Sequence, residues 1–266
     1  MISVFLSTVI ERSSFEWLIV IIERYWLQFL TGAGVTLLIA LSGTLVGFVI
    51  GLLIGVIRTI PRNPDGTAFR RGLRKVGDFL LVSYIEVFRG TPMIVQAMVI
   101  YYGAAMVLNL HMSPIGAGFF IVSINTGAYM AEIIRGGILS IDPGQSEAAH
   151  AIGMTHRQTM INIVLPQAVR NILPALGNEF VINIKDTSVL NVISVSELFF
   201  SSKSAAGNNF RTFEVFFVTC VIYFVMTFTV TRILRLIEKK MAGSSSYTIH
   251  GSQTVPESEI KIRGGV

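Results

Sequence analysis

The chain has 266 residues, of which 52% are hydrophobic and only 14% are charged, and its formal net charge is +5. A soluble domain usually carries about 25% charged residues, so this composition argues against a soluble protein and favours a membrane protein. The basic residues lie beside apolar runs, so membrane topology explains the net charge and we expect no nucleic-acid partner. The single cysteine, Cys220, excludes an intrachain disulfide.

The N-terminal segment, residues 1–25, contains one short apolar stretch, FEWLIVII at 15–22. It is too short to cross a bilayer core of about 30 Å, which needs roughly 20 residues. Charged residues flank it on both sides, so we expect an interfacial helix at the outer face of the membrane. A sixth membrane span is the alternative.

Five apolar runs follow and predict an all-α transmembrane domain over residues 26–240. Thr91 and Pro92 suit the start of the second run, as N-cap and first helical residue. The remaining residues, 241–266, are short of large apolar side chains, and we expect a disordered cytoplasmic tail. The five predicted spans are 26–57, 90–110, 112–131, 172–199 and 213–231.

Lysine and arginine residues near the ends of the predicted spans orient the chain. Thirteen lie in the segments 58–78, 135–170 and 232–240, whereas four lie on the opposite side. Cytoplasmic loops are enriched in these residues. We therefore place the N-terminus outside and the C-terminus in the cytoplasm, and an odd number of spans agrees with this.

Glycine recurs at every fourth position of the first span. This spacing makes one smooth helix face that another backbone can approach closely. We expect this face to pack within the subunit, and a subunit interface is the alternative. No internal repeat of the kind found in secondary transporters is visible, so we expect a solute pathway between two permease subunits. The four glycines are Gly43, Gly47, Gly51 and Gly55.

The stretch EAAHAIGMTHRQTMINIVLPQAV, residues 147–169, lies in a cytoplasmic segment that predicts two short helices over about 142–166. Asp142 and Pro143 suit the N-cap and first residue of the first helix, and Gly153 its C-terminal end. A helix resting on lipid usually has a basic face opposite bulky apolar residues. The centre of this helix, Glu-Ala-Ala-His-Ala, has neither, so it favours a protein partner.

The second of these helices has its own start signal. Thr155 and Gln158 have the spacing of a capping box. An apolar stretch follows, and we expect the helix to end before Pro166. The result is a pair of short helices joined by a glycine corner.

These residues resemble the EAA motif of ABC importer permeases, EAA-x3-G-x9-I-x-LP, at every fixed position. The stretches SYIEVFRGTPMIVQ (83–96) and LPALGNEFVINIKDTSVLNVIS (173–194) look like the polar amino-acid branch of that family. The resemblance runs from about Leu27 to Lys240, and PRNPDGTAFRRGLRK (61–75) departs from it as a longer first cytoplasmic loop. The motif residues are Glu147, Ala148, Ala149, Gly153, Ile163, Leu165 and Pro166.

The resemblance implies a type I ABC importer permease fold in the cytoplasmic membrane, crossed several times. It implies that the motif residues couple this chain to a dimer of cytoplasmic ATPase subunits, which bind ATP and Mg²⁺. A second permease subunit, identical or homologous, would complete the pathway. An extracellular or periplasmic binding protein would deliver a polar amino acid of the glutamine, glutamate, arginine, histidine or cystine class.

The sequence itself contains no nucleotide-binding loop of the form G-x4-GK[ST]. It also shows no metal-ligand spacing and no nucleophile elbow. We therefore expect no enzymatic activity, metal or cofactor in this chain. A carrier or channel driven by an ion gradient, without an ATPase, is the alternative function, and transport by it would be indifferent to an inactive ATPase partner.

Ionisable groups within membrane spans are costly and are functional by default. Glu179, Asn183, Asp186 and Thr187 share one face of the fourth predicted span. A carboxylate there can hold an ammonium group, and the amide and hydroxyl can add hydrogen bonds. We expect this face to contact the solute, and a polar interface between two permease subunits is the alternative.

Two smaller groups of polar residues are further candidates. Asn125, Tyr129 and Glu132 share a face of the third predicted span. Glu132 lies near its cytoplasmic end, where a solvated or paired charge is the alternative to a functional role. Glu86 and Arg89 have the spacing of an i, i+3 pair, and we expect a structural ion pair at the membrane edge.

Overall fold

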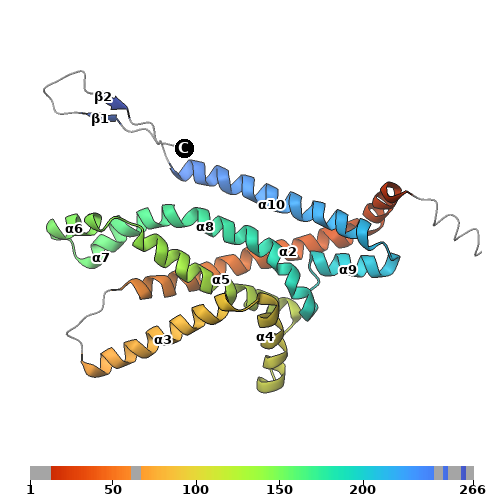
Figure 1. The fold of residues 1–266 in the computed structure, drawn as a ribbon, viewed down its shortest axis with the longest axis horizontal. Helices are drawn as coiled ribbons and strands as arrows, with labels where there is room; N and C mark the ends of the chain where they lie inside the picture. Colours follow the sequence, from red (N-terminus) through yellow and green to blue (C-terminus); the bar gives the residue numbers. More distant parts are fainter. Residues whose placement is uncertain (1–12, 61–66, 243–247, 251–258, 262–266) are drawn as a thin grey trace, which may run out of the picture.

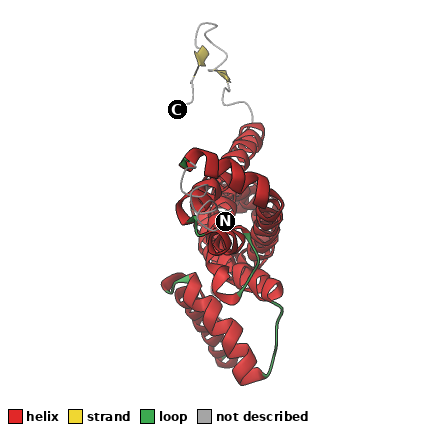
Figure 2. Cartoon of the chain, turned by 90° about the vertical axis from the view of Figure 1, so that its right-hand side faces the viewer, coloured by secondary structure: helices red, strands yellow, loops and turns green. Residues whose placement is uncertain are grey.

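The computed structural model describes residues 13–60, 67–242, 248–250 and 259–261 (Figure 1). Helices make up nearly all of this part of the chain (Figure 2). Their bounds are α2 (Ser14–Thr59), α3 (Ala68–Gly90), α4 (Met93–Leu108), α5 (Pro114–Leu139), α6 (Pro143–Ala151), α7 (His156–Thr159), the π-helix η1 (Met160–Val164), α8 (Leu165–Asp186), the 3₁₀-helix η2 (Thr187–Ile193), α9 (Leu198–Asn209) and α10 (Thr212–Ala242).

Two strands of three residues complete the described chain. β1 (Thr248–His250) and β2 (Glu259–Lys261) pair antiparallel, with Ile249 opposite Ile260. They fall within the tail for which we predict disorder. The rest of that tail lies outside the described residues.

Three described helices are long and apolar enough to cross a membrane, namely α2, α5 and α10. Helices α3 and α4 pass the same test together, as a pair bent by 115°. The prediction of an all-α membrane fold is therefore confirmed for the described bundle. The count of five spans stays a prediction.

Helix α2 contains both the expected interfacial helix and the first expected span. It begins at a capping box formed by Ser13 and Glu16 and runs unbroken for 46 residues, about 69 Å at 1.5 Å per residue. The prediction of a separate helix at 15–22 is wrong. Glu23 and Arg24 are exposed on the surface of the continuing helix, and no glycine or proline between them and residue 26 interrupts it.

The second expected span, 90–110, and the loop before it also differ from the structure. Helix α3 begins at Ala68, so much of the segment 58–78 is helical. Thr91 ends α3 with φ −123° and ψ 147°, and Pro92 is the N-cap of α4, so the predicted helix start is wrong. Proline pushes the residue before it out of the α-helical region, which accounts for the bend between α3 and α4.

The fourth expected span, 172–199, is not a single helix. Helix α8 ends at Asp186, a 3₁₀ segment follows, and Ser194 takes a left-handed conformation at φ 64°. Glu197 then caps α9, because its carboxylate accepts from the backbone N–H groups of Phe199 and Phe200 at 2.7 Å each. The apolar run continues through this region, so hydropathy does not reveal the break.

The glycine face of α2 packs inside the subunit, as predicted, and its partner is α5. A Cβ atom added at Gly51 would lie 2.3 Å from the Cβ atom of Met130, and one at Gly43 would lie 2.5 Å from Val122 Cγ1. Gly47 and Gly55 meet the same helix. The absence of side chains therefore lets the two backbones come into close contact.

The long helices form one bundle whose two ends differ (Figure 1). The C-terminal ends of α2 and α10, the N-terminal end of α3 and the pair α6–α7 lie at the same end of the molecule (left in Figure 1). These are the basic segments that we expect in the cytoplasm. The fold thus brings the basic segments to one end of the molecule, in agreement with the orientation predicted from the lysine and arginine residues.

Replacing Gly51 by Ala tests the close packing of α2 on α5. The new methyl group would meet Met130 and the backbone of Ala131, so we expect a destabilisation of about 1–3 kcal/mol. Gly34→Ala is the matched control in the same helix, because its Cβ would meet nothing within 4 Å. Thermal unfolding in detergent measures both, and equal melting temperatures for the two variants would contradict the packing.

Candidate functional site

The pair of short helices forms a capped corner at one end of the bundle. Asp142 accepts from the backbone N–H of Gly144 at 2.8 Å and starts α6, with Pro143 in its first turn. Gly153 ends it at φ +84°. Its N–H donates to His150 O, and the N–H of Met154 donates to Ala149 O, each at 3.0 Å. This is a Schellman motif, and the predicted glycine corner is confirmed.

Helix α7 begins as predicted, but the chain continues differently beyond it. Thr155 and Gln158 form the capping box. The helix does not stop before Pro166. It passes through η1, where the N–H of Leu165 donates to Met160 O, and runs straight into α8. The wider π turn accommodates the missing N–H of Pro166, so the prediction that the second helix ends there is wrong.

The hairpin formed by α6, Gly153 and α7, residues 142–159, offers most of its surface to a partner. Glu147 and Ala148 are exposed, and Ile152 has 78% of its surface exposed. Ala149 is 1% exposed. The small side chains leave the backbone of α6 accessible, and the motif residues Ile163 and Leu165, in η1 and at the start of α8, are half-buried.

Asn183 lies inside the bundle and joins three helices. Its side-chain amide donates to Thr44 Oγ1 of α2 at 2.8 Å and to Thr126 Oγ1 of α5 at 2.9 Å. Thr187 is also buried, and its hydroxyl donates to Ile184 O at 2.9 Å. The contacts of Asn183 therefore fasten α8 to α2 and α5, whereas the hydrogen bond of Thr187 stays within its own segment of the chain.

The two carboxylates of the same helix are more accessible. Glu179 and Asp186 are half-buried, and Glu179 interacts electrostatically with Asp186 and with Arg89 of α3. The guanidinium carbon of Arg89 lies 5.7 Å from the ring centroid of Tyr129 in α5. Glu179 thus interacts with a second anionic group of α8 and with a cationic group of α3. We call Glu179, Asp186 and Arg89 the charged cluster.

Glu86 is exposed on α3, and no ion pair between it and Arg89 occurs in the described part of the chain. Asn125 is buried and donates to Gln96 Oε1 at 2.8 Å. The amide of Gln96 in turn donates to the carbonyls of Phe88 and Thr91, each at 2.9 Å. These contacts hold the α3–α4 bend against α5, so Asn125 has a structural role in this fold.

Glu132 is paired at the end of α5 that leads to the hairpin. Its carboxylate accepts from Arg58 of α2 and, at 2.8 Å, from Arg135 one turn along its own helix. The alternative of a paired end charge is thus the one that the structure supports. The pair also joins the ends of α2 and α5.

Sequence reasoning missed one buried carboxylate, Glu197. Besides capping α9 it accepts from the hydroxyl of Tyr223 in α10 at 3.0 Å, and its side chain is completely buried. The signal was present in the sequence, since Ser-Val-Ser-Glu at 194–197 precedes the apolar start of α9. The apolar run around it concealed the helix start.

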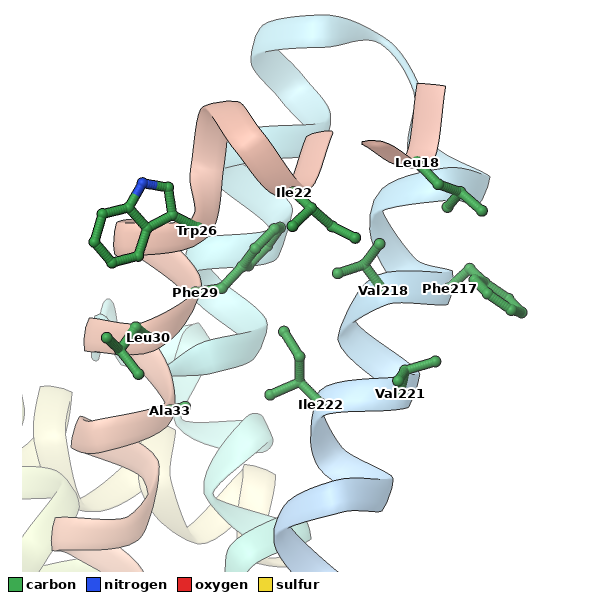
Figure 3. A pocket seen from close by; sticks show the side chains of 10 residues that line it. All are labelled: Leu18, Ile22, Trp26, Phe29, Leu30, Ala33, Phe217, Val218, Val221 and Ile222. Atoms are coloured by element: carbon green, nitrogen blue, oxygen red, sulfur yellow. The ribbon is translucent and has the colours of Figure 1, made fainter. Parts of the chain in front are cut away.

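An apolar groove lies between α2 and α10 (Figure 3). Its lining side chains are all hydrophobic and include Trp26, Phe29 and Phe217. It offers almost no polar partner for an amino acid. Such a groove suits lipid chains, so it is not a candidate for the solute site.

Comparison with known proteins assigns the family. The model of the family described as "Binding-protein-dependent transport system inner membrane component" matches residues 63–243 of this chain. The chain belongs to this family. The glutamine transport system permease protein GlnP of Escherichia coli (strain K12) is 40% identical over 211 residues, which cover 79% of this chain and 91% of that protein. The arginine transport system permease protein ArtQ of Bacillus subtilis (strain 168) is 31% identical over 215 residues, or 81% and 93% of the two chains.

Solved structures agree with this assignment. A chain in the crystal structure of an amino acid ABC transporter with histidines has a TM-score of 0.72 and 36% identity, and the match covers 82% of this chain and 96% of that one. A chain of the MetNI methionine ABC transporter, in an inward-facing conformation, has a TM-score of 0.68 and 18% identity. At that identity the match shows a shared fold only. The fold that the EAA resemblance implies, that of an ABC importer permease, is confirmed.

Replacing Asn183 by Leu tests its structural role. The hydroxyls of Thr44 and Thr126 would lose their amide partner, so we expect a loss of about 1–3 kcal/mol in stability. Asn178→Leu is the control on the same helix, at an exposed position. Thermal unfolding of both variants, of Thr44→Val alone and of Asn183→Leu combined with Thr44→Val measures the coupling. If the two substitutions at 183 and 44 were additive, no such contact would exist.

Proposed function

We propose that this chain is the membrane permease subunit of an ATP-driven importer that takes up a polar amino acid. The exposed hairpin at residues 142–159, which carries Glu147, Ala148, Ala149 and Gly153 of the EAA motif, is the observation that carries the proposal. Membership in a family of binding-protein-dependent transport components and the likeness to glutamine and arginine permeases support it. No observation favours a carrier driven by an ion gradient.

In this proposal the hairpin docks in a groove of a cytoplasmic ATPase subunit. The ATPase dimer binds ATP and Mg²⁺ and closes, and the hairpin passes that movement to the membrane bundle. The chain itself does not catalyse the hydrolysis of ATP. Helix α8 receives the movement directly, because it continues from α7 through η1. Helix α5 receives it through the short connection at residues 140–142.

The proposed assembly contains two permease subunits, two ATPase subunits and an extracellular or periplasmic binding protein. The N-terminus lies outside, the C-terminus in the cytoplasm, and the chain resides in the cytoplasmic membrane. The collection of the basic segments at one end of the bundle supports this orientation (Figure 1). The membrane lipid surrounds the outer faces of α2 and α10, whose side chains are largely exposed and apolar.

The charged cluster is the proposed solute site. An amino acid carries an ammonium and a carboxylate, and Glu179 or Asp186 can pair with the first while Arg89 pairs with the second. Asn183 supports this site indirectly, because its amide holds α8 against α2 and α5, and the hydroxyl of Thr187 is already bonded to Ile184 O. The cluster is therefore suited to a zwitterionic or cationic solute.

Replacing Gly153 by Val tests the docking of the hairpin. Valine is strained at a φ of +84°, so we expect the corner to distort and solute-stimulated ATP hydrolysis to fall by at least tenfold, while membrane insertion persists. Gly153→Asn is the matched control, because asparagine tolerates left-handed backbone and should retain most of the coupling. Near-normal stimulation of the Val variant in reconstituted vesicles would contradict the docking role.

Replacing Glu179 by Gln tests the solute site. The variant loses one negative charge of the charged cluster, so we expect uptake of a cationic or zwitterionic amino acid to fall about tenfold or more, with assembly of the importer unchanged. Glu23→Gln, at an exposed position of α2, is the control. Labelled amino-acid uptake by vesicles measures both, and wild-type kinetics for Glu179→Gln would remove this residue from the site.

A further inference from the structure

A second hollow lies between α8 and α10, and unlike the apolar groove it gathers positive charge. It has a volume of about 240 Å³ and is lined by Lys185 of α8 and by Arg232 and Arg235 of α10. Phenylalanine, valine and threonine side chains make up the rest of the lining, and no carboxylate belongs to it. Three cations from two helices thus surround one space.

None of these cations has an anionic partner in an ion pair within the described chain. The guanidinium of Arg232 lies over the ring of Phe228, 4.7 Å from its centroid. Asp186 interacts electrostatically with its chain neighbour Lys185 but is not part of the lining, so Arg232 and Arg235 carry most of the uncompensated charge. Like charges around one space repel each other, and they do so more strongly beside a bilayer than in water. An anion in the hollow would relieve that repulsion.

The depth of the hollow indicates which anion is available. The largely apolar part of α10 from Thr212 to Thr231 is about 30 Å long at 1.5 Å per residue, which matches a bilayer core. Arg232 and Arg235 therefore lie at headgroup level. The C-terminal end of α10, the part of the helix to which both arginines belong, lies at the same end of the bundle as the hairpin (Figure 1). The long stem of Lys185, which is exposed, can extend its ammonium toward the same level.

We propose that this hollow binds the phosphate headgroup of an anionic phospholipid of the cytoplasmic leaflet. The arginine guanidinium groups match a phosphate in shape and charge. Basic pockets between membrane helices on the cytoplasmic side bind such headgroups. Phe224 and Phe228, which also line the hollow, provide apolar surface for the acyl chains. The assignment of the lipid to the cytoplasmic leaflet rests on the orientation given in the proposed function. The binding of a headgroup in the hollow does not depend on that orientation.

The test measures lipid retained by the purified, complete importer. The complex is equilibrated with vesicles of phosphatidylcholine and phosphatidylglycerol, re-isolated, and analysed by native mass spectrometry. We expect Arg232→Gln combined with Arg235→Gln to weaken phosphatidylglycerol retention roughly thirtyfold, because each arginine contributes about 1 kcal/mol to the binding of an anionic lipid and two are removed. Lys239→Gln combined with Lys240→Gln removes the same charge from the same helix outside the hollow, and it should retain the lipid. Lys185→Gln provides an independent variant should the double arginine variant fail to assemble.

Three outcomes would overturn the proposal. Equal retention by all variants would mean that the hollow does not select the lipid. Displacement of the lipid by inorganic phosphate at equal concentration would assign the hollow to a free anion. A disulfide between copies of a Phe228→Cys variant would show that a second permease subunit covers it. Because lipid retention is measured separately from uptake, loss of transport with intact lipid binding would count against the proposed function alone.

Discussion

The close approach of α2 and α5 is the constraint on which the other contacts of this bundle depend. Four glycines remove the side chains that would hold the two backbones apart. Only at that spacing can one amide, from Asn183, reach hydroxyls on both helices. The same approach brings Arg58 within reach of Glu132 near the hairpin end. Helices α2, α5 and α8 are thereby fastened together at several levels.

The polar residues of the bundle fall into two groups. Those with partners inside the bundle, such as Asn125 and Asn183, hold its shape. The others, in the exposed hairpin and the half-buried charged cluster, are those for which we propose contact with an ATPase and with a solute. Helix α8 joins the two, since it begins at the hairpin and carries Glu179 and Asp186 further along. In the proposed function, a movement of the hairpin therefore acts on the same helix that carries the proposed solute site.

Local signals in the sequence predicted the local structure well. Asp142, Gly153 and the Thr155 capping box act over a few residues, and all three behave as expected. The glycine spacing also predicted a packing face. Hydropathy, in contrast, measures only how apolar a run is, so it could not locate the bend at Pro92 or the break after Asp186. Nor could spacing alone show that Asn183 turns toward Thr44 and Thr126, because that depends on neighbours far away in the chain.

The central claim is that the exposed hairpin is the surface through which an ATPase moves this fastened bundle. The most direct test places a cysteine at Ala148 and a photoactivatable crosslinker on it in the assembled importer. The account predicts a crosslink to the ATPase subunit whose yield changes when ATP is trapped. A crosslink to lipid alone, unaffected by ATP, would contradict it.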